Sequence, residues 1–284
     1  MPTPAVRKVL PKELTSYDLL KSLAVILMVC DHVGFFFFPE EMWFRTLGRL
    51  CLPIWFFLIG YARSDEIPKI FWIGGGIVTA SSLIAGQFLL PLNILFTMAL
   101  MRKCRDGIVH SALSSPQALR GMFFILLLLS FPSALLVEYG SLAMLIGLVG
   151  FIARRRDSIY ERIERKYILM YVVAAFFSTY IMMGVQMPSL SGAQTLVLTL
   201  GYALLGVTLW RFKPLVFSDA RKYMAGSFVA MFRFMGRYSL EIYVVHLVAL
   251  KVAAMIINPE RFTFWGWQVI DPNTLSIFIM GGVQ

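Results

Sequence analysis

The chain has 284 residues, of which 58% are hydrophobic and only 15% are charged, and its mean hydropathy is +0.74. A soluble protein of this length cannot bury so much apolar surface, so the composition excludes a soluble domain and indicates an integral membrane protein. The formal net charge of +10 would suit a nucleic-acid-binding protein. We expect no nucleic-acid partner, because the basic residues lie in short loops between apolar runs, which is typical of cytoplasmic loops.

A series of apolar runs follows a basic, proline-containing segment at residues 1–16, which we interpret as a cytoplasmic tail. The runs predict helices at 17–38, 44–61, 69–90, 93–104, 120–137, 141–153, 167–185, 195–211 and 237–257. A last apolar run at 274–283 leaves the predicted count at nine to ten. The expected fold is an all-α, polytopic transmembrane bundle, with residues 17–284 as one domain. The basic connector at 211–236 is expected to lie on the membrane surface.

The distribution of Lys and Arg predicts the orientation of this bundle. If the N-terminus is cytoplasmic, 22 of the 26 basic residues fall in inner loops or in the adjoining helix ends. The other four are Arg45, Arg49, Lys251 and Arg261. Because cytoplasmic loops of membrane proteins are enriched in Lys and Arg, the sequence predicts a cytoplasmic N-terminus.

An Asp-His pair interrupts the first apolar run. His32 lies 13 residues after Leu19, roughly 20 Å from the inner end of a helix, so we expect it in the outer half of the bilayer. An ionisable residue at this depth needs a partner or a function. Asp31 cannot orient His32, because neighbouring helical residues point about 100° apart, so we predict Arg49 as its partner. Alternatively, Asp31 and Arg49 only join two helices while His32 bonds a backbone carbonyl.

The helix predicted at 237–257 carries a second polar stripe. Ser239, Tyr243 and His246 follow at i, i+4 and i+7, with Tyr238 just before them, and His246 lies roughly 14 Å from the inner end. Two histidines at overlapping depth on different helices suggest a shared polar cavity. The alternative is that His246 is a hydrogen-bonded packing residue.

Other polar residues are compatible with a site or with ordinary structure. Asn93 and Thr97, one turn apart, either face the same cavity or bond across a helix interface, which is the more common case. The basic loops are usually topology determinants, yet a nucleotide arriving from the cytoplasm needs cations for its phosphates. Candidates near the inner mouth are Lys21, Arg63, Arg102, Lys103 and Arg237. The three cysteines have no metal-ligand spacing, so we expect no metal site.

Several segments together resemble the TraX family of membrane proteins. They run, in order, from Lys21 through Asp31-His32 to Gly34, then Gly48-Arg49-Leu-Cys-Leu-Pro53, Leu92-Asn93-Ile-Leu-Phe-Thr97, Glu138-Tyr-Gly-Ser-Leu142 and Gly236-Arg-Tyr-Ser-Leu-Glu-Ile-Tyr243-Val-Val-His246. The Asp-His and Gly-Arg-x-x-x-Pro blocks are the specific part of the resemblance. The resemblance covers most of the chain up to about residue 257.

The TraX resemblance implies an acetyltransferase of the bacterial inner membrane, connected with conjugation. Such an enzyme moves acetyl from cytoplasmic acetyl-CoA to the N-terminal amine of pilin, or to another envelope acceptor, on the outer side. His32, Asp31 and Arg49 would then be catalytic, with His32 taking the amine proton or carrying a covalent acetyl group. The residues expected to bind substrate or donor are Lys21, Arg63, Asn93, Thr97, Tyr238, Ser239, Tyr243 and His246. Acetyl-CoA, pilin and membrane lipids are the expected partners.

Three other functions fit the same pattern. An O-acetyltransferase for an envelope glycan or lipid would use the same donor with a hydroxyl acceptor. A proton-coupled transporter would use His32 and His246 as a proton relay. A polytopic assembly protein of the pilus machinery would need no catalysis.

Overall fold

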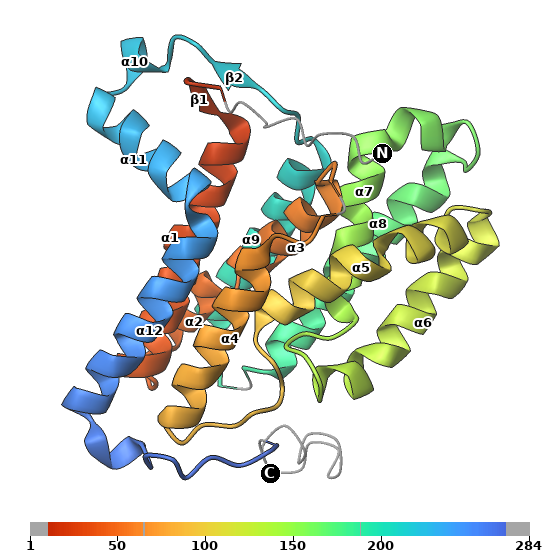
Figure 1. The fold of residues 1–284 in the computed structure, drawn as a ribbon. Helices are drawn as coiled ribbons and strands as arrows, with labels where there is room; N and C mark the ends of the chain where they lie inside the picture. Colours follow the sequence, from red (N-terminus) through yellow and green to blue (C-terminus); the bar gives the residue numbers. More distant parts are fainter. Residues whose placement is uncertain (1–10, 65, 188, 271–284) are drawn as a thin grey trace, which may run out of the picture.

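Helices make up most of the computed structural model, which describes residues 11–64, 66–187 and 189–270 (Figure 1). The helices are α1 (Ser16–Phe37), α2 (Met42–Gly48), α3 (Cys51–Tyr61), α4 (Lys69–Ile84), α5 (Ile94–Ala112), α6 (Pro116–Ala134), α7 (Leu142–Tyr160), α8 (Arg165–Val185), α9 (Gly192–Trp210), α10 (Ala220–Tyr223), α11 (Gly226–Arg237) and α12 (Ser239–Ile257). Two short antiparallel strands, β1 (Leu14–Thr15) and β2 (Val216–Phe217), and a 3-10 turn, η1 (Pro259–Arg261), complete the fold. The all-α prediction is confirmed.

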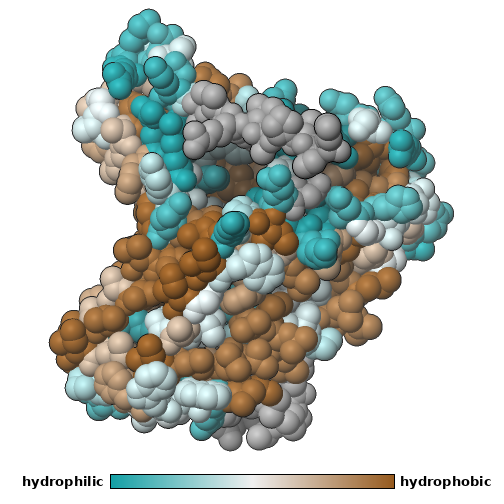
Figure 2. All heavy atoms as spheres, in the orientation of Figure 1, coloured by the Kyte–Doolittle hydropathy of each residue, from teal (hydrophilic) through white to brown (hydrophobic). Residues whose placement is uncertain are grey.

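Six segments of the described chain are long and apolar enough to cross a membrane: α1, α2 with α3, α6, α8, α9 and α12. Three further predicted spans, α4, α5 and α7, fall outside this set. Helix α4 has only 16 residues, and the C-terminal parts of α5 and α7 are rich in charge. Figure 2 shows a broad apolar surface across the middle of the molecule, with hydrophilic residues gathered mainly at the end that carries α10. The chain is therefore a multi-pass membrane protein.

The start of α1 is fixed at the end of the bundle that carries α10 and α11. Thr15 and Asp18 form a reciprocal capping box, which satisfies the first free amides of the helix. The Ser22 hydroxyl donates to the carbonyl of Phe232 in α11 at 2.7 Å, and Arg237 Nε lies 3.7 Å from Asp18 Oδ1. Helix α11 thus crosses α1 and leads directly into α12, so α1 and α12 run side by side toward the opposite end.

Helix α3 lies at the centre of the bundle and is buried over its whole length. Its closest neighbour is α7, where glycines permit the contact: a Cβ at Gly60 would collide with the backbone of Gly147, and one at Gly150 with the backbone at Phe57. Close approach of small residues is the usual way in which membrane helices pack, because lipid supplies no hydrophobic driving force between them.

Several predicted boundaries are wrong. The span expected at 44–61 agrees with the segment Met42–Tyr61, but the helix is interrupted after Gly48, where Pro53 lacks the amide that would bond the carbonyl of Arg49. The helix expected at 69–90 ends at Ile84, just before Gly86, whose φ of 74° is left-handed.

Two helices continue beyond their predicted ends. The helix expected to stop at residue 104 extends to Ala112, and the loop expected from residue 154 is helical to Tyr160, with a kink at Arg155. In both cases charged residues end the apolar run without ending the helix, because they project into the polar end of the bundle. The surface connector contains α10 and α11, and the run at 274–283 lies outside the described residues.

Three loops meet at the other end of the bundle. The segment after α4 bonds the segment after η1, with Leu90 N 2.8 Å from the carbonyl of Val269. It also bonds the α6–α7 loop, where the Leu92 carbonyl accepts from Glu138 N at 2.9 Å. These contacts place residues 138–139 under the ends of α1, α4 and α5.

Candidate active site

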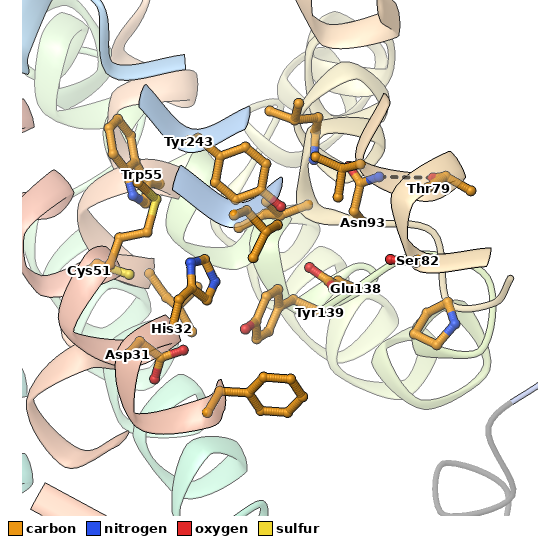
Figure 3. Close-up of a pocket in the computed structure, with 18 of the residues that line it drawn as sticks. Asp31, His32, Cys51, Trp55, Thr79, Ser82, Asn93, Glu138, Tyr139 and Tyr243 are labelled. Carbon is orange, nitrogen blue, oxygen red and sulfur yellow. Dashed lines mark hydrogen bonds between the residues drawn. The ribbon is translucent and has the colours of Figure 1, made fainter. Parts of the chain in front are cut away.

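A cavity of about 570 Å³ lies between α1, α3, α4, α5, α12 and the α6–α7 loop (Figure 3). It extends along one face of α12 from Ser239 to Lys251, a distance of about 18 Å at the rise of an α-helix. Its volume falls within the usual range for small-molecule sites. Most of its wall is apolar, with a small set of polar and charged side chains, which is the usual composition of a binding site.

His32 and His246 form a hydrogen-bonded pair at this cavity. His32 Nδ1 lies 2.8 Å from His246 Nε2, and His246 Nδ1 lies 2.6 Å from the carbonyl of Ile242. A carbonyl only accepts, so His246 Nδ1 carries a proton and its Nε2 is the acceptor for His32 Nδ1–H. His32 Nε2 consequently keeps a free lone pair. His32 itself lines the cavity, and its ring centroid lies 6.1 Å from that of Tyr243 (Figure 3).

Asp31 is matched by two arginines rather than one. Its Oδ2 accepts from Arg45 Nη1 at 2.8 Å, and its Oδ1 lies 3.8 Å from Arg49 Nε. The predicted partner, Arg49, is therefore the more distant of the two. Gly48 makes this approach possible, because a Cβ there would collide with Asp31. All three charged side chains line the cavity.

The Arg49 guanidinium also bonds the α6–α7 loop, donating from Nη1 to the hydroxyl of Tyr139. Tyr139 has a φ of 64°, a left-handed conformation that is uncommon for a residue other than glycine. Strained backbone of this kind is often found at functional sites. Arg49 Nε is buried and has no hydrogen-bond acceptor among the described residues. The cluster therefore holds a buried N–H donor without an acceptor, 3.8 Å from Asp31 Oδ1.

Glu138, beside Tyr139, places a second carboxyl group on the cavity wall (Figure 3). Its own carbonyl accepts from the Thr97 hydroxyl at 2.6 Å, which holds the loop against α5. Burial raises the pKa of this carboxyl to about 7, although Arg49 and the amide of Ile94 oppose the shift. Glu138 therefore changes its charge near neutral pH.

Lys251 lines the cavity near the C-terminal end of α12, and only 2% of its surface is exposed. Its Nζ donates to the hydroxyls of Ser81 at 3.0 Å and Ser82 at 2.6 Å. In the described part of the chain, no carboxylate forms an ion pair with it. An ammonium group in an apolar bundle with only hydroxyl partners has capacity for a further acceptor.

The predicted site residues separate into two groups. Ser239 and Tyr243 line the cavity together with His32, Asp31, Arg49 and Asn93. Asn93 is also structural, because it caps α5 at Leu95 N and donates to the carbonyl of Gly75. His246 contacts the cavity only through His32, and Thr97 only supports the α6–α7 loop.

Lys21, Arg63 and Tyr238 lie away from the cavity. Arg63 and Tyr238 are exposed near the other end of the bundle. Of the other predicted cations there, Arg102 donates to the carbonyl of Glu66 at 2.6 Å, and Arg237 is held by Asp18 and by carbonyls of the segment before α1. Lys103 is exposed on α5.

The charged or polar cavity residues that were not predicted include Arg45, Glu138, Tyr139 and Lys251. Lys251 and Arg45 belong to the few basic residues outside the inner loops. This unusual position is the feature of the sequence that could have identified them as site residues. The Glu-Tyr pair lies in one of the segments that resemble the TraX family. The residues that the structure describes contain no group of three or more His, Cys, Asp or Glu side chains able to hold a metal.

The chain is similar to one known protein family and to a curated protein. The family described as "TraX protein" matches residues 16–254, which include every cavity residue named above. An uncharacterized protein of Rickettsia prowazekii (strain Madrid E) is 31% identical over 153 residues, which cover 51% of this chain and 58% of that protein. The chain thus matches little more than half the length of this relative. No solved structure matches significantly.

Proposed function

The chain belongs to the TraX family, and on that premise we propose that it is an acetyl-CoA-dependent acetyltransferase of the bacterial inner membrane. Its acceptor would be an amine on the outer side of the membrane, most directly the N-terminal amine of a pilin. The observation that carries the proposal is the His32–His246 pair, which leaves an imidazole lone pair at a cavity of suitable size. A base of this kind is what acyl transfer to an amine requires.

The proposed orientation places the N-terminus, α10 and α11 in the cytoplasm, with α4, α5 and α7 added to the six clear spans. Its support is the collection of arginine side chains at that end. Arg154 donates to the carbonyl of Tyr61 at 3.1 Å and to that of Ala62, Arg105 donates to Ala62 at 2.9 Å, and Arg156 to Trp210 at 3.2 Å. The excess of positive charge at one end agrees with the positive-inside rule. His32 then lies in the outer half of the membrane.

In the proposed reaction the acceptor nitrogen attacks the thioester carbonyl carbon. His32 Nε2 takes a proton from this nitrogen as the C–N bond forms, and the C–S bond breaks to release the CoA thiolate. The proton on His32 then passes to the thiolate, so that the products are the acetamide and free CoA. His246 keeps His32 in the required tautomer and, by accepting from Nδ1–H, stabilises the imidazolium that forms.

Arg49 would stabilise the negative charge that develops on the thioester oxygen. Its support is the Nε–H without an acceptor, held beside Asp31 and Tyr139. Fixed donors aimed at developing charge commonly supply the largest single contribution to catalysis. Asp31 balances Arg45 and Arg49, which allows two guanidinium groups to remain near an apolar cavity.

Acetyl-CoA would enter as a substrate from the cytoplasmic end. The cavity has room for a small acyl group and part of the pantetheine arm, and Ser239, Tyr243 and Asn93 offer polar contacts along its wall. The nucleotide would remain outside, near the exposed Arg63 and Lys103.

The test is acetyl transfer by purified protein in proteoliposomes. Labelled acetyl-CoA is supplied with a peptide that has a free N-terminal alanine, and in parallel with the same peptide blocked at its N-terminus and with a glycan that offers only hydroxyls. We expect label on the free peptide alone. Label on the glycan alone would favour the O-acetyltransferase, and proton uptake without acetyl-CoA consumption would favour the transporter.

A further inference from the structure

The outer part of the cavity contains two opposite charges that no ion pair neutralises. Glu138 and Lys251 both line it and interact electrostatically. Within the described residues, however, neither has an oppositely charged partner within 4.0 Å. Asp31, by contrast, has Arg45 at 2.8 Å and Arg49 at 3.8 Å. Leaving a buried charge without a counter-ion is costly. A ligand that supplies both partners would remove this cost.

Asp31 is less suited to such a ligand, although its Oδ1 is buried without a hydrogen-bond partner among the described residues. It is already matched by Arg45 at 2.8 Å and by Arg49 at 3.8 Å, so a third cation would meet two like charges. Glu138 is the other acidic side chain on the cavity wall. Lys251 Nζ has three N–H donors, and two of them bond Ser81 and Ser82, so one remains for a ligand oxygen.

Resting on the proposed function, we propose that Glu138 and Lys251 form the acceptor subsite and select the N-terminus of a peptide. Glu138 holds the acceptor's ammonium group. Lys251 donates to the carbonyl oxygen of the acceptor's first residue. A hydroxyl acceptor carries no charge and gains little from Glu138, so the subsite discriminates against sugars and other alcohols.

The protonation chemistry of Glu138 suits this role. A peptide N-terminus has a pKa of about 7.7 to 8.0 and arrives largely as an ammonium ion, which cannot attack a carbonyl. The raised pKa of Glu138, about 7, lies close to that of the amine, so the carboxylate both binds the ammonium and accepts its proton. That transfer produces a neutral amine and a neutral carboxyl. The second proton leaves during attack and goes to His32, and Glu138 later returns its proton to solvent.

Two variants test the assignment, with acceptor kinetics as the readout. Glu138→Gln keeps the size of the side chain and removes its charge, and Lys251→Met keeps the apolar stem. The acceptors are a peptide with a free N-terminal alanine and propylamine, which has no neighbouring carbonyl. Glu40→Gln, an exposed acid in the α1–α2 loop, is the matched control.

We expect Glu138→Gln to raise the KM of both acceptors by roughly ten- to a hundredfold, the value of a charge-assisted hydrogen bond. Lys251→Met should raise the KM of the peptide and leave that of propylamine unchanged. The KM for acetyl-CoA should stay the same in both variants, which shows that they are folded and bind the donor. Glu40→Gln should match the wild type.

The outcomes separate this assignment from the function on which it rests. Wild-type protein that acetylates neither acceptor contradicts the proposed function itself. Wild-type protein that acetylates the peptide, with an unchanged acceptor KM in Glu138→Gln, overturns the subsite and leaves the function standing. A raised KM for acetyl-CoA in place of the acceptor would assign the two residues to the donor and would also overturn it.

Discussion

The two ends of the bundle use the same basic side chains in opposite ways. At the end with α10, Arg102, Arg105 and Arg154 donate to backbone carbonyls at and after the C-terminus of α3. Cations there complement the free carbonyls and the dipole of the helix. At the other end, Arg45 and Arg49 face a carboxylate beside a cavity.

The difference shows which charges have a structural explanation and which do not. The first set closes a helix end and remains close to the aqueous boundary. The second set lies inside the bundle, where Gly48 lets α2 approach Asp31 closely and the left-handed Tyr139 accepts from Arg49. A fold that needed only stability would be served at least as well by apolar residues at these positions. We therefore assign chemistry to the cavity and structure to the opposite end.

Removing the central carboxylate should give the largest effect. Asp31→Ala leaves two buried guanidinium groups without their counter-charge, and we expect a loss of about 3 to 5 kcal/mol in the free energy of unfolding. Asp219→Ala, which breaks the exposed 2.7 Å pair with Lys222 at the other end, should cost at most about 1 kcal/mol. Thermal unfolding in detergent measures both. Equal destabilisation would contradict the difference between the two regions.

Removing the partner of His32 should slow the reaction without abolishing it. His246→Ala deprives His32 Nδ1–H of its acceptor, and we expect kcat to fall roughly ten- to a hundredfold, as for other residues that orient a functional histidine. His246→Gln retains an acceptor oxygen and should recover part of the rate. His110→Gln, a change of the exposed third histidine, is the control. A rate in His246→Gln as low as that in His246→Ala would show that the hydrogen bond is not what matters.

The charge of Glu138 should make acceptor binding depend on pH. Because burial raises the pKa of this carboxyl to about 7, it is charged above that pH and neutral below it. The acceptor KM should therefore rise as the pH falls below about 7, and Glu138→Gln should remove this dependence. Arg49, Asp31 and Lys251 face the same carboxyl, and only Arg49 and Lys251 favour its charged form.

The same raised pKa predicts the direction of a change in stability. The folded state holds the Glu138 proton at pH values where the unfolded chain, with a pKa near 4.3, has already lost it. This contribution is complete below the unfolded pKa and is lost as the pH rises through about 7. The midpoint temperature of thermal unfolding, plotted against pH, should have a different slope in the wild type and in Glu138→Gln between the unfolded and the folded pKa of this carboxyl. Parallel curves would show that the carboxyl titrates normally.

The smallest effect is expected from the exposed cations at the end that the proposed orientation places in the cytoplasm. Arg63→Ala should raise the KM for acetyl-CoA by about two- to fivefold, with a smaller effect at high salt, because solvent screens this interaction. Arg120→Ala, an exposed arginine on α6, is the control. A change in the acceptor KM with no change in the KM for acetyl-CoA would show that Arg63 acts on the acceptor, which contradicts its proposed role in binding acetyl-CoA.

The sequence predicted the helices better than the site. Long apolar runs such as those of α1, α8 and α12 determine a membrane helix by length alone, so their positions agree within about two residues. The break before α3 and the extension of α5 depend on packing and on where the aqueous boundary lies. Neither is visible in a hydropathy pattern.

The site residues could be predicted from the sequence where polar residues recur at helical spacing. They could not be predicted where a loop supplies them. Helical spacing and depth indicated that His32 and His246 belong together. Nothing in the sequence indicates that residue 138 lies against α5, because that placement depends on its hydrogen bonds with Leu92 and Thr97. Arg45 was overlooked although it lies one helical turn before Arg49, with Arg49 N bonded to the carbonyl of Arg45 at 3.0 Å, so that both arginines face Asp31.

The most direct test of the account compares the two single-histidine variants His32→Ala and His110→Ala. Purified protein is given labelled acetyl-CoA and the peptide with a free N-terminal alanine, and acetylated peptide and free CoA are quantified together. We predict that His110→Ala behaves as the wild type and that His32→Ala loses at least roughly a hundredfold in rate, as expected for a general base. If the two variants acetylate the peptide equally, His32 is not the base, and the assignment of chemistry to this cavity is wrong.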